Sequence, residues 1–83
     1  MYHVYQLRND AGRSYVGLSG NVAERVAQHN RGESRWTAKY RPWELAWVSR
    51  PMNLGDARRL ENLLKRQKGG DGLTVLLREF AGS

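Results

Sequence analysis

The chain has 83 residues, a net charge of +6, 40% hydrophobic residues and no cysteine. This length predicts a single domain over residues 1–83, and the hydrophobic fraction is too high for a disordered protein. The absence of cysteine excludes disulfides, cysteine-ligated zinc and thiol catalysis, which is consistent with the cytoplasmic location that we expect.

The sequence predicts no association with a membrane. Its first ten residues lack the apolar core of a signal peptide, and no stretch approaches the roughly 18 apolar residues of a membrane-spanning helix. The isoelectric point of about 10.3 instead favours a polyanionic partner, most often nucleic acid. Charge alone leaves open the alternative of a basic protein that has no anionic partner.

The N-terminal third predicts a β-hairpin followed by a helix. Residues 2–8 alternate in polarity and are rich in β-branched and aromatic side chains, and residues 14–19 form the return strand after a turn rich in Asn, Asp and Gly. Asn21 followed by Glu24 resembles a capping box, which opens a helix over residues 22–30.

The remainder of the chain predicts one more strand and two more helices. Residues 31–42 indicate a polar, basic loop that contains aromatic side chains, and residues 43–49 a third strand between two prolines. A long helix opens at Asn53 or Asp56 and reaches about Lys68, before the breaker sequence GGDG.

The last segment, residues 73–80, suits a strand by composition. The spacing of Leu73, Leu76, Leu77 and Phe80 favours instead a short amphipathic helix capped by Asp71. The predicted order is β-β-α-β-α-α, which is a small three-stranded sheet with helices packed on it.

Two polar side chains lie one turn apart on the first predicted helix. Val22 and Val26 define its buried stripe, and Arg25 and His29 flank that stripe, so they are expected to point together from the edge of the core. The alternative is a solvated basic flank, which is the usual position of such residues.

A carboxylate falls on the apolar face of the second long helix, where Glu61 lies within the arc of the leucines. An inward-facing carboxylate is costly unless it is paired or binds a cation. Two interpretations stay open: a salt bridge at the edge of the core, or a ligand of Mg²⁺, which proteins often hold by one or two carboxylates. The apolar arc consists of Leu54, Ala57, Leu60, Leu63 and Leu64.

The two strand tyrosines, Tyr5 and Tyr15, are core aromatics in the commoner interpretation. If both hydroxyl groups emerge beside Arg25, His29 and Glu61, the set can hydrolyse a phosphodiester. That reaction needs a cation at the phosphate oxygens, a group that deprotonates water and a metal that supports the leaving oxygen.

In these motifs the sequence resembles the GIY-YIG nucleases. The first motif of that family stands here as HVY at residues 3–5, with His3 in the place of glycine, and the second as YVG at residues 15–17. Leu18 follows where relatives in excision repair carry lysine. The segment around Arg25 and His29 is similar to the helix that carries the catalytic arginine of the family.

The resemblance continues into the second half of the chain. Residues 39–48 are similar to the third-strand segment of small stand-alone bacterial members, and residues 56–69 to the metal-binding helix, with Glu61 at the metal ligand. The chain is also similar to the GIY-YIG catalytic domain of the excision-repair nuclease, which suggests a role in DNA repair.

This resemblance implies an α/β (α+β) domain built on an antiparallel sheet, and a DNA endonuclease that requires one Mg²⁺ or Mn²⁺ and no small-molecule cofactor. It implies that Tyr5 or Tyr15 acts as general base, that Arg25 steadies the phosphate and that Glu61 binds the metal. The role of His29 stays open, and Gly17 would allow a close approach of a neighbour.

Contacts with DNA are expected from the basic residues of the loop and of the long helix, mainly to phosphates, which implies low sequence selectivity. Selectivity for DNA structure stays open, as does the oligomeric state. Trp36 and Tyr40 could stack on unpaired bases. Trp43 and Trp47 are expected to pack on the sheet, and that alternative stays open for Trp36. The expected DNA-binding residues are Arg31, Arg35, Trp36, Lys39, Arg41, Arg58, Arg59, Lys65, Arg66 and Lys68.

Two other functions are consistent with the same sequence. One is a nucleic-acid-binding module that is non-catalytic or activated by a partner, and the other is a protein-assembly domain whose basic charge is incidental. Metal-dependent cleavage would support the nuclease, and salt-dependent binding without cleavage would support the module.

Overall fold

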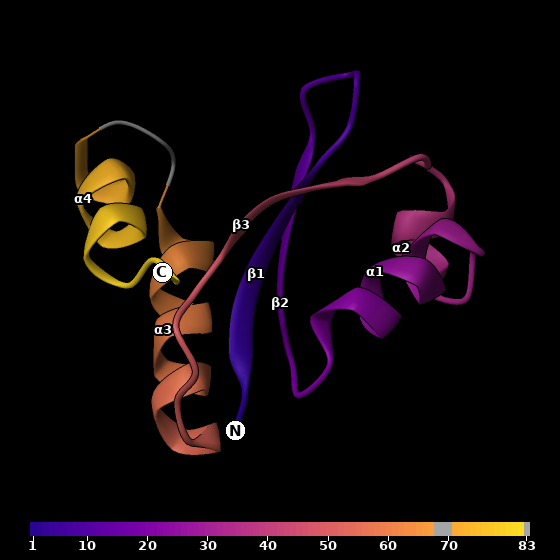
Figure 1. Ribbon diagram of the computed structural model, residues 1–83. Helices are drawn as coiled ribbons and strands as arrows, with labels where there is room; N and C mark the ends of the chain where they lie inside the picture. Colours follow the sequence, from indigo (N-terminus) through magenta and orange to yellow (C-terminus); the bar gives the residue numbers. More distant parts are fainter. Residues whose placement is uncertain (68–70, 83) are drawn as a thin grey trace.

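A computed structural model describes residues 1–67 and 71–82 of the chain (Figure 1). Its centre is a three-stranded antiparallel sheet of β1 (His3–Arg8), β2 (Ser14–Ser19) and β3 (Glu44–Val48), in the order β2-β1-β3. The strand predictions are therefore confirmed, and β2 forms one free edge of the sheet.

The predicted helices are also present: α1 (Val22–Asn30), α3 (Leu54–Arg66) and α4 (Asp71–Glu79). Asp71 is the first residue of α4 rather than a cap before it. The predicted end of α3 near Lys68 lies outside the described residues. Within the described part of the chain, no helix is long and apolar enough to cross a bilayer.

One element was not expected. The segment predicted as an irregular loop contains the short helix α2 (Arg35–Ala38). Tyr40, just after this helix, is three residues from Thr37 and four from Trp36, as on one helical face, but these residues are too few to give a periodic signal in the sequence.

Local hydrogen bonds explain where the elements begin. The Asn21 side chain accepts a hydrogen bond from the Glu24 N–H at 3.1 Å, and the Asn53 side chain accepts one from the Asp56 N–H at 2.8 Å. Asn53 rather than Asp56 therefore caps α3. Such caps satisfy amide groups that have no partner within the helix.

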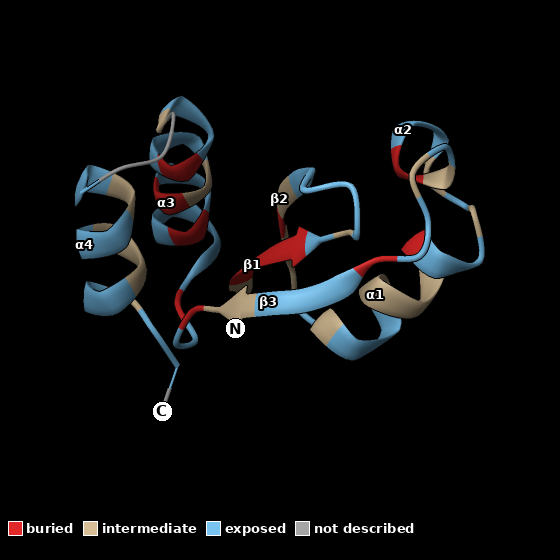
Figure 2. Ribbon diagram, turned by 90° about the horizontal axis from the view of Figure 1, so that it is seen from above, coloured by how far each residue is buried: buried red, intermediate tan, exposed pale blue. Residues whose placement is uncertain are grey.

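The two faces of the sheet carry different layers of helices (Figures 1 and 2). Because strand side chains alternate, Val4 packs with Ala57, Leu60 and Leu64 of α3 on one face. Tyr5 and Leu7 pack on the other face, where α1 and α2 lie, with Trp43 and the half-buried Val22 and Val26. α3 and α1 therefore approach the sheet from opposite sides.

Candidate active site

The first motif and helix α1 are joined by one buried hydrogen bond. Tyr5 Oη lies 2.9 Å from His29 Nε2, and the two side chains are 1% and 0% exposed. His29 therefore points toward the sheet, and the alternative of a solvated basic flank does not hold for it, because the structure buries it. A buried imidazole requires partners for its nitrogens, and Tyr5 supplies one of them.

The second partner of His29 comes from α2. His29 Nδ1 lies 2.8 Å from Thr37 Oγ1, and the Thr37 hydroxyl donates to the Ser34 carbonyl at 3.3 Å. A carbonyl can only accept, so the Thr37 oxygen receives the proton of His29 Nδ1. His29 Nε2 is then the acceptor for the Tyr5 hydroxyl, which fixes one neutral tautomer of the imidazole.

Burial shifts the pKa values of both partners. Burial lowers the pKa of His29 below its ordinary value of 6.5, and the positive charge of Arg25 lowers it further. Burial is also the main reason why the pKa of Tyr5 rises to about 12, and the neighbouring Tyr15 raises it too. Near neutral pH this hydrogen bond therefore joins an uncharged phenol to an uncharged imidazole.

Tyr15, from the second motif, completes the aromatic cluster. Its ring centroid lies 4.9 Å from that of His29 in an edge-to-face arrangement and 6.4 Å from that of Tyr5. Tyr15 is only half buried, so water can reach its side chain more readily than that of Tyr5.

Gly17 makes room for this cluster. It is the cross-strand partner of Tyr5, and a Cβ atom at position 17 would lie 2.6 Å from Tyr5 Oη. The Tyr5 ring therefore passes directly over the backbone of the edge strand β2, toward the free edge of the sheet. A side chain at position 17 would displace it.

Arg25 is half buried on α1, and its guanidinium donates to Gln28 Oε1 at 2.8 Å. Its charge opposes the upward shift in the pKa of Tyr5 and contributes to the downward shift for His29. Arg25 therefore lies near enough to Tyr5 and His29 for its charge to affect the pKa values of both, as its position on α1 predicted.

Glu61 reaches this region from the other face of the sheet. It lies on α3, as part of the face that packs on β1 and β2, and its side chain is 14% exposed. Its carboxylate pairs with Lys65 at 3.2 Å, and Lys65 is 50% exposed, so this ion pair is open to water. The negative charge of Glu61 contributes to the raised pKa of Tyr5, which links it electrostatically to the cluster.

The expected DNA-binding residues are distributed over two surfaces. Arg35, Lys39 and Arg41 are exposed around α2, whereas Arg58, Arg59, Lys65 and Arg66 are exposed on α3. Arg31 is committed to ion pairs with Glu24 and Glu33, and Arg59 to one with Asp56. Lys68 lies outside the described residues.

The three tryptophans differ in their surroundings. Trp43 is buried and donates its indole N–H to the Thr37 carbonyl at 2.8 Å, and half-buried Trp47 donates to the Leu77 carbonyl at 2.9 Å. Both were expected to pack on the sheet, and both do so. Trp36, in contrast, is 43% exposed beside Tyr15.

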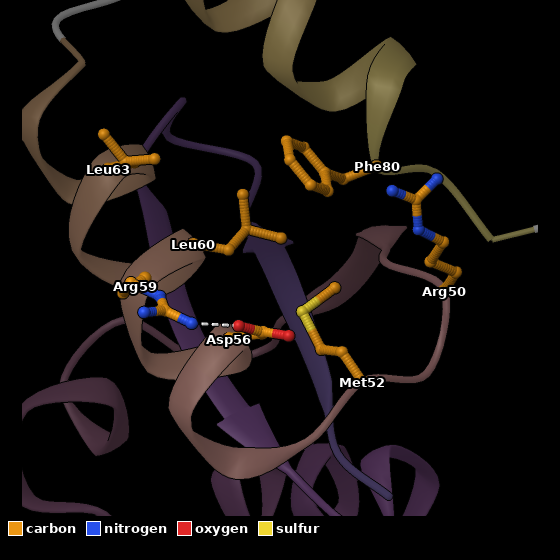
Figure 3. A pocket seen from close by; sticks show the side chains of 7 residues that line it. All are labelled: Arg50, Met52, Asp56, Arg59, Leu60, Leu63 and Phe80. Carbon is orange, nitrogen blue, oxygen red and sulfur yellow. Dashed lines mark hydrogen bonds and ion pairs between the residues drawn. The ribbon is translucent and has the colours of Figure 1, made fainter.

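An apolar hollow lies away from the tyrosine–histidine cluster. It has a volume of about 320 Å³ and is lined by Met52, Leu60, Leu63 and Phe80, with arginines and Asp56 at its rim (Figure 3). None of the expected catalytic residues lines it, so its size does not make it the candidate active site.

Sequence reasoning missed Thr37, which determines the tautomer of His29 through a hydrogen bond inside the core. A threonine within a basic loop gives no signal of that role. The only indication was that Thr37 lies between Trp36 and Tyr40, which are four residues apart, as on one face of a helix.

Comparisons with known proteins found a matching family model and two sequence relatives. A family model described as the GIY-YIG catalytic domain matches residues 1–72. A UPF0213 protein of Nitratidesulfovibrio vulgaris is 34% identical over 77 residues, which cover 92% of this chain and 70% of that protein. A UPF0213 protein of Aeromonas salmonicida is 37% identical over 67 residues, which cover 80% of this chain and 49% of that protein. The chain therefore spans about half of the second relative's length, and no solved structure gave a match.

The geometry at Gly17 makes a first prediction. Gly17→Ala should push the Tyr5 ring away and break its hydrogen bond to His29, at a cost of about 1–3 kcal/mol in the free energy of unfolding. Gly20→Ala is the matched control, because its Cβ atom would meet nothing nearer than 3.6 Å. Urea unfolding of both variants checks this prediction, and an equal effect of the two substitutions would contradict it.

The hydrogen bond from His29 to Thr37 makes a second prediction. In wild-type protein, ¹⁵N NMR should show His29 protonated at Nδ1. Thr37→Val should leave that N–H without a partner and destabilise the protein by about 1–3 kcal/mol, whereas Thr37→Ser should retain the tautomer. A wild-type spectrum with the proton on Nε2 would disprove the assignment.

The lowered pKa of His29 predicts a pH dependence of stability. The unfolded state binds more protons than the folded state below pH 6.5, so the free energy of unfolding should fall as the pH falls from 7.5 toward 5.5. His29→Gln should remove most of this slope. Urea unfolding at both pH values measures the slope, and a slope that persists without His29 would refute its origin.

Proposed function

This chain belongs to the GIY-YIG catalytic domain family, and we propose that it hydrolyses phosphodiester bonds in DNA with the help of a divalent cation. The observation that carries the proposal is the meeting of both motif tyrosines with His29 over Gly17. The residues of this cluster come from two strands and a helix, so the cluster forms only when the chain folds.

Tyr15 is the better candidate for the general base. A general base must come within hydrogen-bonding distance of the attacking water, and Tyr5 is 1% exposed and has a pKa of about 12. The half-buried Tyr15 is accessible to water. Its phenolate would take a proton from water as the water oxygen bonds to phosphorus and the bond from phosphorus to the 3′ oxygen breaks. Tyr5 and His29 then serve to position Tyr15.

Arg25 is the candidate for phosphate binding. Its half-buried guanidinium contacts the neutral Gln28 and exerts its charge on the cluster. A guanidinium in that position can stabilise the negative charge that develops on the phosphate oxygens.

Glu61 is the candidate metal ligand. It offers a single carboxylate, largely shielded by the packing of α3, and its ion pair with Lys65 can be exchanged for a cation because Lys65 is half exposed. No cluster of three or more acidic or histidine side chains occurs in the residues described. A Mg²⁺ or Mn²⁺ ion at Glu61 would therefore draw its remaining ligands from water and substrate, and would supply support for the leaving oxygen.

Affinity for DNA would come from the exposed cations around α2 and on α3, whose contacts to phosphates carry little sequence information. This supports low sequence selectivity. We propose that the protein consists of one domain, acts in the cytoplasm and has DNA as its partner. A role in DNA repair is consistent with this activity.

The assignment of Arg25 and Glu61 predicts the outcome of a cleavage assay. Arg25→Gln and Glu61→Gln should each slow Mg²⁺- or Mn²⁺-dependent nicking of supercoiled or branched DNA by about 100-fold or more, because the first removes the positive charge at the phosphate and the second the carboxylate ligand of the metal. Glu24→Gln, on the exposed surface of α1, is the control and should cleave like wild type. Nicking by either site variant at the wild-type rate would exclude the assigned role. Salt-dependent binding without any cleavage would favour the partner-activated module instead.

A further inference from the structure

Two stacked tryptophans next to the active site differ sharply in exposure. Trp36 and Trp43 lie with ring centroids 5.9 Å apart and an interplanar angle of 30°. Trp43 is 3% exposed, whereas Trp36 is 43% exposed. Packing of the core therefore accounts for Trp43, but it leaves a large part of the Trp36 indole in contact with solvent.

Trp36 continues the aromatic cluster of the active site toward solvent. Its ring is stacked on Tyr15, with centroids 6.1 Å apart and an angle of 29° between the planes. Tyr15 in turn contacts His29 edge to face. A planar group placed on Trp36 would thus be separated from the proposed general base by a single ring.

The surroundings of Trp36 are cationic. Tyr40 packs against Trp36 at 5.0 Å, and the Arg13 guanidinium lies 4.1 Å above the Tyr40 ring. Tyr40 also lines a hollow of about 290 Å³ whose rim includes Lys39 and Arg41, with Asp10 as its one carboxylate.

These cations are available to an anionic ligand. Within the described ranges 1–67 and 71–82, no carboxylate lies within salt-bridge distance of Arg35, Lys39 or Arg41. A partly exposed indole, bordered by cations that pair with no described carboxylate, matches the two components of a nucleotide, which are a planar base and a charged phosphate.

We propose that Trp36 is a stacking platform for an unpaired base next to the scissile phosphate, and that the preferred substrate is DNA with a single-stranded segment at the cleavage position. In a duplex the faces of each base are occupied by its neighbours, so an indole can use them only where the strand is unpaired. Lys39 and Arg41 bind the phosphates that follow, and the base on Trp36 brings the strand against Tyr15.

This inference rests on the proposed nuclease function, but its test does not require cleavage. The affinity of the full chain in EDTA is measured by fluorescence anisotropy for labelled oligothymidylate of about 12 nucleotides and for a blunt duplex of the same length. Trp36→Ala should weaken binding of the single strand at least about fivefold and leave duplex binding within about twofold.

Two further variants separate stacking from charge. Trp36→Phe retains a π face and should restore most of the affinity for the single strand. Lys39→Ala should weaken single-strand and duplex binding alike, because a phosphate contact does not depend on pairing. Equal losses for both DNAs in Trp36→Ala, or no loss for either, would overturn the platform.

A measurement on the wild-type protein tests the proposal even if the Trp36→Ala variant does not fold. In ¹H–¹⁵N spectra, oligothymidylate should shift the indole N–H signal of Trp36, whereas the signal of Trp47, bonded to the Leu77 carbonyl, should stay in place. An unchanged Trp36 signal at saturating oligonucleotide would reject the proposal. If DNA binds through Trp36 but is not cleaved, the nuclease function is rejected and the stacking role of Trp36 stands. If Trp36→Ala cleaves DNA like wild type and binds it equally well, the stacking role is rejected and the nuclease function stands.

Discussion

The hydrogen bond between Tyr5 and His29 is the interaction on which the site depends. Both side chains are buried, so each polar atom must find a partner within the protein, and the two satisfy each other at 2.9 Å. This requirement fixes α1 against β1, and the second nitrogen of His29 then fixes Thr37 and with it α2. The placement of Trp36 and Trp43 follows, since both are attached to that short helix or packed against it.

The division of the sheet into two faces explains why the site forms at one edge. Tyr5, Tyr15 and His29 lie on the face covered by α1, whereas Glu61 belongs to α3 on the opposite face. β2 is the edge strand that lies between these two layers. Gly17 has no side chain, so the Tyr5 ring can pass over β2 at this position. Glu61 and Tyr5 therefore belong to different layers of the core, although the charge of Glu61 contributes to the raised pKa of Tyr5.

In the proposed function, one side chain of the catalytic cluster also contributes to substrate binding. Tyr15 belongs both to the proposed catalytic cluster and to an aromatic stack that includes the partly exposed Trp36. A base bound on that stack would lie close to Tyr15, the proposed general base. The proposed binding of unpaired DNA and the proposed positioning of its phosphate would therefore use one surface, which is bordered by the cations around α2.

The sequence by itself determined the strands, the three longer helices and the cap at Asn21, because alternation, helical spacing and turn residues act over a few neighbours. It also singled out Tyr5, Tyr15, Arg25, His29 and Glu61. Only the tertiary structure decided that His29 is buried with a fixed tautomer, that Thr37 holds it, and that Glu61 approaches from the other face. Those facts depend on contacts between residues far apart in the chain, and no local pattern encodes which buried nitrogen will meet which hydroxyl.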